Sequence, residues 1–324
     1  MAFIVSLLFA FVPTLLMAWF VYWLDRYEKE PLVLIGATFF WGMAIAAGSA
    51  FVINTIFGLG IYMVTGSDAI SNQATASLVA PFVEEGLKGL AVLIVFLFFH
   101  KEFDSILDGI IYAGIVALGF AAAENMLYIY LYGYLQNGWH GLWSMVIIRD
   151  VIVAWQHPFF TAFTGIGLAV ARINRNMIIK VLAAPFGYGL AVFAHAFHNS
   201  FGAWIGGFPG LALGSLIDWS GWIIMFIFIV MMITREHNIL KRQLSEEVAA
   251  GIITDGQYRR ALSPLTASIA LFLGGFRASR FYQACGELAL KKDQLQKIGD
   301  EGGNQRIIDS LRDELANLSP GVKA

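Results

Sequence analysis

The sequence predicts an all-α membrane protein: a polytopic bundle of about seven transmembrane helices followed by a short cytoplasmic helical tail. Of the 324 residues, 58% are hydrophobic and 14% are charged, against roughly 25% charged residues in an ordinary soluble domain. The mean hydropathy is +0.68. Apolar stretches of roughly 20 residues, the length that crosses a bilayer, recur along the first part of the chain.

Seven stretches satisfy this length rule. They lie near residues 2–24, 32–60, 75–99, 105–131, 144–171, 178–204 and 210–234. The first stretch lacks the basic residues and the small-residue cleavage site of a signal peptide. We therefore expect it to be the first span rather than a removed leader.

Basic residues indicate the orientation of these spans. Every second connection carries them, beginning with Arg26, Lys101, Arg172 and Arg235. The intervening connections, near 61–74, 132–143 and 205–209, carry neither Lys nor Arg. Because cytoplasmic loops are enriched in Lys and Arg, the N-terminus is expected outside and the C-terminus in the cytoplasm.

The composition changes after residue 234, which predicts a membrane domain over 1–234 and a cytoplasmic helical tail over 235–324. The tail is polar, and IIDSLRDELANL (307–318) has the apolar spacing of an amphipathic helix. The apolar segment 266–276 is too short to span a bilayer. It either lies in the membrane surface or is buried in a small helical bundle.

Charge and cysteine content exclude some classes of function. The formal net charge of -2 gives no support to a nucleic-acid partner. The single cysteine, Cys285, excludes a disulfide or a thiolate metal cluster within one chain.

Ionisable residues inside the predicted spans are the candidate functional residues. Each such charge costs about 2.5–3.5 kcal/mol on insertion scales, so it needs a partner or a role. The spans contain Glu84, Glu85, Lys88, Asp108, Glu124, Arg149, Asp150, His157, His195 and His198.

Four of these residues lie at a similar depth on four different spans. Counted from the outer ends at about 1.5 Å per residue, Glu84, Glu124, His157 and His195 lie roughly 10–20 Å deep. Such a polar layer in the outer half of the bilayer predicts one site built from several helices.

Spacing within the spans refines this prediction. Lys88 follows Glu84 by four residues and Glu85 by three, so it can reach either carboxylate. The adjacent glutamates point about 100° apart, so one is expected to perform chemistry while the other is held by Lys88 or the backbone. His195 and Asn199 share one helix face, as do His157, Thr161 and Thr164.

Each of these residues also has a purely structural interpretation. A Glu–Lys pair can be a buried ion pair, and a lone His is usually a hydrogen-bonded core residue. Arg149 and Asp150 lie near the outer boundary, where a structural role is favoured. The shared depth of the Glu and His residues is what favours a functional site.

Four motifs resemble those of the PrsW family of intramembrane proteases. They are EEGLK (84–88), FAAAEN (120–125), HPFFTAFTGIG (157–167) and HAFHN (195–199). WLDRYEKEP (23–31) is similar to the family's first loop, so the resemblance covers about residues 20–204. Compared with the related CAAX-processing and bacteriocin-immunity endopeptidases, Lys88 stands one position short of their Arg. Glu124 stands where their FxxxH motif has its His.

The resemblance implies a membrane-embedded peptidase of the bacterial cell membrane. It would cut a single-span protein substrate, such as an anti-sigma factor, near the outer face as the first step of a signalling cascade. Hydrolysis needs an activated water and a stabilised oxyanion. Glu84 or Glu85 would be the general base, and His195 and Asn199 would donate to the oxyanion or orient the water.

The roles of the remaining motif residues stay open. Glu124 and His157 either complete a hydrogen-bond network or, with His195, bind a zinc ion. Lys88, Asn125 and His198 are supporting residues. Metal-dependent and metal-free hydrolysis are both compatible with the sequence, with a slight preference for the metal-free reaction because Glu124 replaces a His.

Two other classes of function remain at this point. Intramembrane carboxylates are also typical of transporters and proton relays, although no internal repeat is evident. A haem-binding membrane protein would use His157 and His195 as ligands from facing helices. A non-catalytic scaffold that keeps the motifs is a further alternative.

Overall fold

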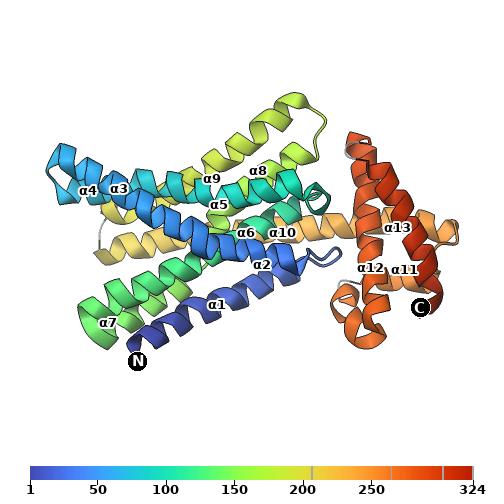
Figure 1. Cartoon of the computed structure of the whole chain (residues 1–324), viewed down its shortest axis with the longest axis horizontal. Coiled ribbons are helices and arrows are strands. Elements are labelled where there is room, and N and C mark those ends of the chain that lie inside the picture. Colours follow the sequence, from blue (N-terminus) through green and yellow to red (C-terminus); the bar gives the residue numbers. More distant parts are fainter. Residues whose placement is uncertain (206, 264, 301–302, 323–324) are drawn as a thin grey trace.

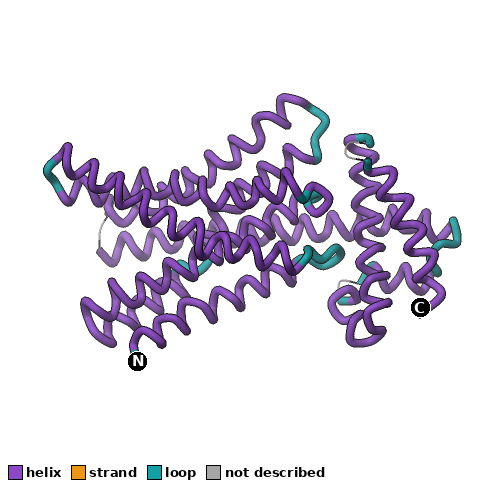
Figure 2. Tube along the Cα trace, viewed as in Figure 1, coloured by secondary structure: helices purple, strands orange, loops and turns teal. Residues whose placement is uncertain are grey.

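The computed structural model describes residues 1–205, 207–263, 265–300 and 303–322. Within these ranges every regular element is a helix and no strand occurs, as Figure 2 shows. The predicted all-α class is therefore confirmed.

Ten α-helices make up the apolar part of the described chain. The first are α1 (Ala2–Leu24), α2 (Leu32–Phe40), α3 (Ala47–Thr65), α4 (Asp68–Ala74) and α5 (Ala80–Phe98). They are followed by α6 (Ile106–Leu127), α7 (Leu135–Ile147), α8 (Gln156–Arg172), α9 (Met177–Ile205) and α10 (Gly207–Ala249). The π-helical turns η1 (Trp41–Ala46), η2 (Thr75–Val79), η4 (Tyr128–Tyr134) and η5 (Ile148–Ile152) extend several of them.

Five helical segments of the described chain are long and apolar enough to cross a membrane. They are Ala2–Leu24, Leu32–Thr65, Ile106–Arg172, Met177–Phe201 and Ala212–Ala249. The third contains α6, α7 and α8 in succession. The helix α5 is absent from the group because Glu84, Glu85 and Lys88 interrupt its apolar sequence. Length and composition thus support a polytopic membrane bundle, whereas the count of seven spans stays a prediction.

Two predicted connections are much shorter than the sequence suggested. The connection expected over 61–74 reduces to Gly66 and Ser67, where Gly66 ends α3 with φ of 66°. The connection expected over 132–143 reduces to a sharp bend at Asn137 and Gly138, and Gly138 has φ of 57°. Glycine adopts this left-handed conformation without a Cβ clash, so the helices continue almost to the turn.

The fifth predicted span is not one helix. Residues 144–171 contain the end of α7, the turn η5, a break at residues 153–155 and then α8. The break matters for function because it puts Gln156 and His157 at the start of a new helix. Irregular backbone at membrane depth is tolerated where protein or a cavity surrounds it.

Glycine contacts bring the central helices unusually close. A Cβ on Gly165 of α8 would lie 2.0 Å from the Gly109 carbonyl oxygen of α6. A Cβ on Gly167 would lie 2.4 Å from the Ala183 carbonyl oxygen of α9. Small residues at such contacts allow backbones to approach and to pack by van der Waals contact. As a result α8 lies directly against both α6 and α9.

The tail is joined to the apolar bundle by a continuous helix. The helix α10 passes position 235, the predicted domain boundary, without a break. Beyond it lie α11 (Asp255–Ala261), α12 (Thr266–Ile298), α13 (Asn304–Leu318) and the short η6 (Ser319–Gly321). Ile308, Leu311 and Leu315 of α13 are buried in the tail core, which confirms the amphipathic helix.

The segment 266–276, predicted either at the membrane surface or in a helical bundle, has one described residue in the tail core and one exposed aromatic residue at its end. Ala270 is buried in the tail core and Phe276 is 85% exposed. The side chains of residues 267–269 and 271–273 lie outside the described residues.

The tail docks against the end of the bundle opposite the N-terminus (Figure 1). Tyr27, from the loop after α1, is buried in the tail core. A Cβ on Gly286 of α12 would lie 2.1 Å from the Tyr27 carbonyl oxygen, so helix and loop are in backbone contact. Lys291 of α12 pairs with Asp104 and donates to the Lys101 carbonyl oxygen at 2.7 Å.

The orientation is testable with a phosphatase that is active only outside the cytoplasm. Fused after Asn137, at the bend near the start of α7, the reporter is expected to be active. Fused after Leu318, at the end of α13, it is expected to be inactive, because the two positions lie at opposite ends of the molecule (Figure 1). The reverse pattern would invert the topology.

Docking of the tail is expected to weaken as pH rises. Burial raises the pKa of the Glu28 carboxyl well above its ordinary range, and the charge of Asp104 raises it further. The charge of Lys291 lowers this pKa in part. The charges of Glu287 and Asp108 add smaller increases. The folded chain retains a proton on Glu28 that the unfolded chain releases, and this retained proton stabilises the docked tail. The stabilisation is fully present below the ordinary pKa of a glutamate. It is lost as pH rises through the raised pKa of Glu28.

Limited proteolysis of the tail at about pH 6 and about pH 9 measures this effect. Cleavage is expected to be faster at the higher pH, and Glu28→Gln is expected to flatten the difference. Equal protection of the wild-type tail at both pH values would contradict the prediction.

Candidate active site

The charged residues of α5 have two different environments. Glu85 is fully buried, and its Oε1 accepts from Lys88 Nζ at 2.5 Å and from His195 Nδ1 at 2.9 Å. Its Oε2 accepts from Thr161 Oγ1 at 2.8 Å. Both oxygens are therefore bound, and the charge is balanced by a lysine that is itself fully buried. The sequence predicted that Lys88 or the backbone holds one glutamate of the pair, and Lys88 holds Glu85.

Glu84 faces the other way and keeps a free oxygen. Its Oε1 accepts from Asn54 Nδ2 of α3 at 3.3 Å. Its Oε2 is buried and finds no hydrogen-bond partner among the described residues. His195 Nε2 lies 3.9 Å from that oxygen. Of the two glutamates, Glu84 thus has the carboxylate oxygen that no group of the described residues occupies.

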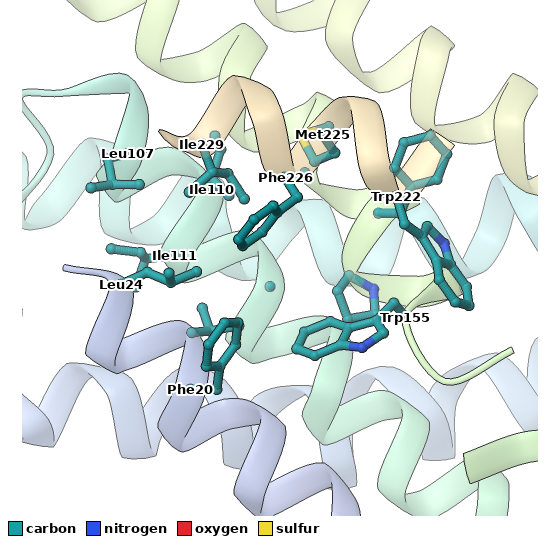
Figure 3. A pocket seen from close by; sticks show the side chains of 15 residues that line it. Phe20, Leu24, Leu107, Ile110, Ile111, Trp155, Trp222, Met225, Phe226 and Ile229 are labelled. Atoms are coloured by element: carbon teal, nitrogen blue, oxygen red, sulfur yellow. The ribbon is translucent and has the colours of Figure 1, made fainter. Parts of the chain in front are cut away.

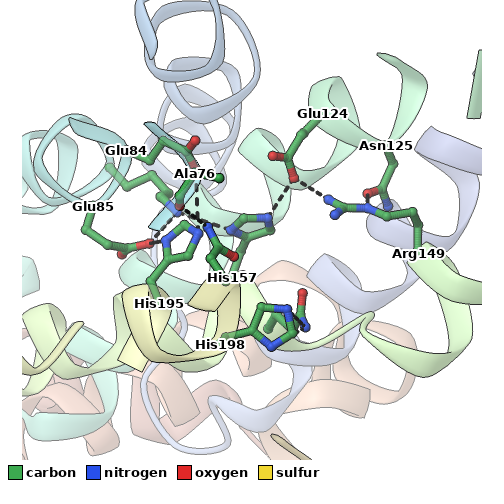
Figure 4. Close-up of polar contacts among 12 residues, drawn as sticks. Ala76, Glu84, Glu85, Glu124, Asn125, Arg149, His157, His195 and His198 are labelled. Carbon is green, nitrogen blue, oxygen red and sulfur yellow. Dashed lines mark hydrogen bonds and ion pairs between the residues drawn. The ribbon is translucent and has the colours of Figure 1, made fainter. Parts of the chain in front are cut away.

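The second half of the site centres on Glu124 of α6. Its Oε2 accepts from His157 Nε2 at 2.8 Å and also pairs with Arg149 Nη2. Arg149 Nε donates to Asn125 Oδ1 at 2.8 Å, and Asn125 Nδ2 donates to Asp150 Oδ1 at 3.0 Å. Figure 4 shows this network beside the glutamates of α5. Arg149 therefore fixes the carboxylate that contacts His157.

The break before α8 positions His157. This residue is the second of α8, so it lies where the helix begins rather than along its length. The first turn of a helix leaves backbone N–H groups unpaired and favours nearby negative charge. His157 Nδ1 faces Lys88 Nζ at 3.3 Å, and its ring centre lies 5.4 Å from that of His195. The two imidazoles are therefore direct neighbours.

Glu84, His157 and His195 form a group that could hold a metal ion. One ligand atom from each lies within 4.8 Å of the others, and all three residues are buried. Glu124 is not in this group, so the set differs by one residue from the Glu124, His157 and His195 set expected from the sequence.

The environment of the group fits zinc. Each imidazole uses one nitrogen to donate to a carboxylate, His195 to Glu85 and His157 to Glu124. Such carboxylate–histidine pairs typically orient zinc ligands and leave the other nitrogen for the metal. The free Glu84 Oε2 supplies the third ligand. If His157 Nδ1 bound the metal, Lys88 Nζ would have to leave its present position 3.3 Å from that nitrogen. Its ion pair with Glu85 could remain.

Two predicted residues turn away from this centre. His198 donates from Nδ1 to Asp218 Oδ2 at 2.7 Å, and Gln156 Nε2 donates to the same carboxylate at 3.1 Å. Asn199 Nδ2 donates to the Ala76 carbonyl oxygen at 2.8 Å, within the π-helical turn η2. In this arrangement Asn199 completes the hydrogen bonding of the backbone that leads into α5.

Sequence reasoning missed several residues of the site. Asp218 is an acidic residue within a predicted span, so the same rule that selected Glu124 could have found it. Arg149 was expected near the outer boundary in a structural role, whereas it pairs with Glu124. Asn54 is uncharged, and nothing local in the sequence marks it as the partner of Glu84.

Two cavities of the described structure differ in chemistry. One, of about 360 Å³, lies between α1, α6, α8 and α10, and only apolar and aromatic side chains line it (Figure 3). The other, of about 720 Å³, has Glu84 and Glu124 in its wall together with polar residues of α3 and η2. The second cavity is therefore the one that gives access to the ionisable centre.

The geometry argues against the haem-binding alternative. Axial histidines must lie on opposite faces of a porphyrin, which needs a gap between the rings. His157 and His195 are in edge-to-face contact, with 5.4 Å between their centres and 80° between their planes. Phe160 stacks on His195 at 5.0 Å.

Comparison with known sequences identifies the family. The profile of the PrsW family of intramembrane metalloproteases matches residues 30–233, which is more than half of the chain. The chain belongs to this family. The match includes all four motifs from which the sequence predicted the resemblance, and that prediction is confirmed.

Several PrsW relatives support the assignment. The chain is 32% identical over 153 residues to protease PrsW of Geobacillus kaustophilus, covering 47% of this chain and 60% of the relative. The protein of Clostridioides difficile is 36% identical over 124 residues, covering 38% and 50%. That of Bacillus subtilis is 30% identical over 158 residues, covering 48% and 64%. The matches thus span between half and two thirds of these relatives. No solved structure matches the chain significantly.

Removing Lys88 is expected to destabilise this PrsW family member. Lys88→Met leaves Glu85 charged and unpaired in a buried site, an effect typically worth about 3–5 kcal/mol. Thermal unfolding of the purified protein and its amount in membranes measure the loss. The double variant Lys88→Met with Glu85→Gln is expected to be less destabilised than Lys88→Met. A single variant as stable as the wild type would show that the pair has no structural role.

Proposed function

We propose that the protein is an intramembrane endopeptidase of the bacterial cell membrane. Its substrate would be a single-span membrane protein of the anti-sigma-factor type, cut near the outer face. The proposal rests on family membership and on the free Glu84 Oε2 beside two imidazoles at the wall of a 720 Å³ cavity.

The metal-dependent version has the stronger support, although the sequence slightly favoured the other. Glu84, His157 and His195 would hold a zinc ion. A bound zinc would act as a Lewis acid that lowers the pKa of a water and polarises the peptide carbonyl. The two carboxylate–histidine pairs and the family description favour this version.

The side chains of the chain have separable tasks in this mechanism. Glu85 and Glu124 hold the imidazoles in fixed orientations, and Lys88 balances the charge of Glu85. Glu124 shares the cavity wall with Glu84, so it is the carboxylate positioned to take a proton from the attacking water. The water oxygen bonds to the peptide carbon, the C–N bond breaks, and Glu124 passes the proton to the leaving amine.

The transporter and proton-relay alternatives have less support. Buried carboxylates alone would be compatible with them. However, Glu85 and Glu124 are each bound to a basic side chain and an imidazole, an arrangement that fixes ligands rather than passing protons along a row.

Metal content and cleavage test the proposal together. The protein, purified in detergent, is expected to contain about one zinc per chain, as a single three-ligand site implies. Glu84→Gln, His157→Ala and His195→Ala are each expected to lower the zinc content. Glu124→Gln is expected to keep zinc but to lose cleavage of a single-span substrate by about 100-fold or more.

His198→Gln is the matched control for the zinc measurement. His198 lies one turn from His195 on the same helix but faces Asp218, so the variant is expected to keep the metal. A strong chelator is expected to abolish cleavage, and added zinc to restore it. Unchanged zinc in His195→Ala, or cleavage that resists chelation, would overturn the metal-dependent mechanism.

A further inference from the structure

The backbone break that precedes α8 has no cap of its own. Residues 153–155 are not helical, and Trp155, the residue before α8, provides no side-chain hydrogen bond to the helix. A helix end leaves N–H and C=O groups without helical partners, and apolar surroundings make each unpaired group costly. The conformation of this break therefore needs support from another element.

Two adjacent residues of α10 supply that support. Trp219 Nε1 donates to the Ile152 carbonyl oxygen at 2.8 Å, at the last residue before the break. Asp218 Oδ2 accepts from Gln156 Nε2 at 3.1 Å, at the first residue after the break. One turn of a neighbouring helix thus holds both sides of the break.

The contact between α10 and α8 is close and shielded. Gln156 is 3% exposed and Asp218 is 6% exposed, so water does not compete for their hydrogen bond. Hydrogen bonds to an ionised carboxylate are roughly twice as strong as neutral ones. A Cβ on Gly221 would lie 2.8 Å from the Phe159 ring, so the two helices pack tightly just beyond the break. The support that α10 gives to α8 is therefore rigid.

The position of His157 depends on where α8 starts. His157 follows Gln156 directly, so the first turn of the helix sets the place of its imidazole. Its Nε2 contacts Glu124 Oε2 at 2.8 Å, and its ring centre lies 5.4 Å from that of His195. Contacts of this length tolerate little displacement, and a shift of about 1 Å caused by a distant substitution can cost much of the performance of a site.

We infer that Asp218 and Trp219 are positioning residues for His157, which they act on by fixing the break before α8. Within the described part of the chain, neither residue hydrogen-bonds to a candidate metal ligand. The inference rests on the proposed function and adds to it a helix outside the four sequence motifs. His198 shares the carboxylate of Asp218, but the bond from Gln156 does not need it, so His198→Gln still keeps the metal.

Trp219→Phe tests the bond before the break. The substitution removes the indole N–H and keeps an aromatic ring, and zinc is expected to bind about 3- to 10-fold more weakly, as for one lost hydrogen bond. Trp222→Phe is the matched control, one turn later on the same helix. Trp222 Nε1 has no hydrogen-bond partner among the described residues, so this variant is expected to bind zinc as the wild type does. Competition with a chelator of known zinc affinity measures both.

An exchange of side chains tests the bond after the break. Gln156→Glu places a second carboxylate beside Asp218 and is expected to weaken zinc binding by about 10-fold or more. Adding Asp218→Asn returns an amide to the pair, with donor and acceptor reversed, and is expected to restore most of the lost affinity. Recovery in the double variant shows that the specific bond matters. Lower thermal stability with unchanged zinc affinity in all these variants would show a role in folding only, which overturns the inference.

Backbone hydrogen exchange tests the support without any metal. In the metal-free protein, peptides that cover residues 152–160 are expected to exchange faster in Trp219→Phe than in the wild type. Trp222→Phe is expected to leave their exchange unchanged. Faster exchange reports local opening of the break, because the amides lose protection when their segment moves.

The outcomes separate this inference from the proposed function. Zinc affinity like that of the wild type in both Trp219→Phe and Gln156→Glu would overturn the inference and leave the peptidase proposal intact. Equal losses in Trp219→Phe and Trp222→Phe would also overturn it, because they would reflect general packing. A wild-type protein without zinc would overturn the metal-dependent mechanism. Hydrogen exchange then decides the inference: faster exchange in Trp219→Phe alone supports it, and unchanged exchange overturns it.

Discussion

The buried pair of Glu85 and Lys88 is the interaction on which the site depends. Both side chains are fully buried on α5, a helix whose other residues apart from Glu84 are mostly apolar. An isolated charge is very costly there, so the pair is stable only because further groups complete its hydrogen bonds. Those groups are Thr161 of α8 and His195 of α9. One carboxylate therefore holds three helices in a fixed relation and orients an imidazole at the same time.

Close helix packing makes that arrangement possible. Gly109, Gly165 and Gly167 let the backbones of α6, α8 and α9 approach until side chains from all three can meet. The break before Gln156 then starts α8 at the depth of the site, which directs His157 toward Glu124. Without the short backbone distances, the polar groups would face lipid or one another through empty space.

Buried hydrogen bonds divide the polar residues into those that support the site and those free to act. Glu85 and Asn199 have their acceptors or donors occupied by protein partners, whereas Glu124 uses Oε2 for both His157 and Arg149. Glu84 keeps one oxygen, Oε2, that has no hydrogen-bond partner among the described residues. Occupied groups give rigidity, and rigid surroundings allow a metal ligand to be held without reorganisation. The same division explains why nearby residues of similar chemistry have different expected roles.

The sequence by itself determined the helical class, the membrane character and the layer of ionisable residues. Hydropathy, charge alternation and depth are properties along the chain, and the cost of a charge in lipid makes each intramembrane Glu, Lys or His conspicuous. Tertiary structure alone decided which side chain each of these residues meets. The rotation of each helix is set by its neighbours, so adjacent Glu84 and Glu85 diverge into a free and a bound carboxylate. For the same reason His198 turns to Asp218, and the uncharged Asn54 reaches Glu84 from a helix thirty residues earlier in the chain.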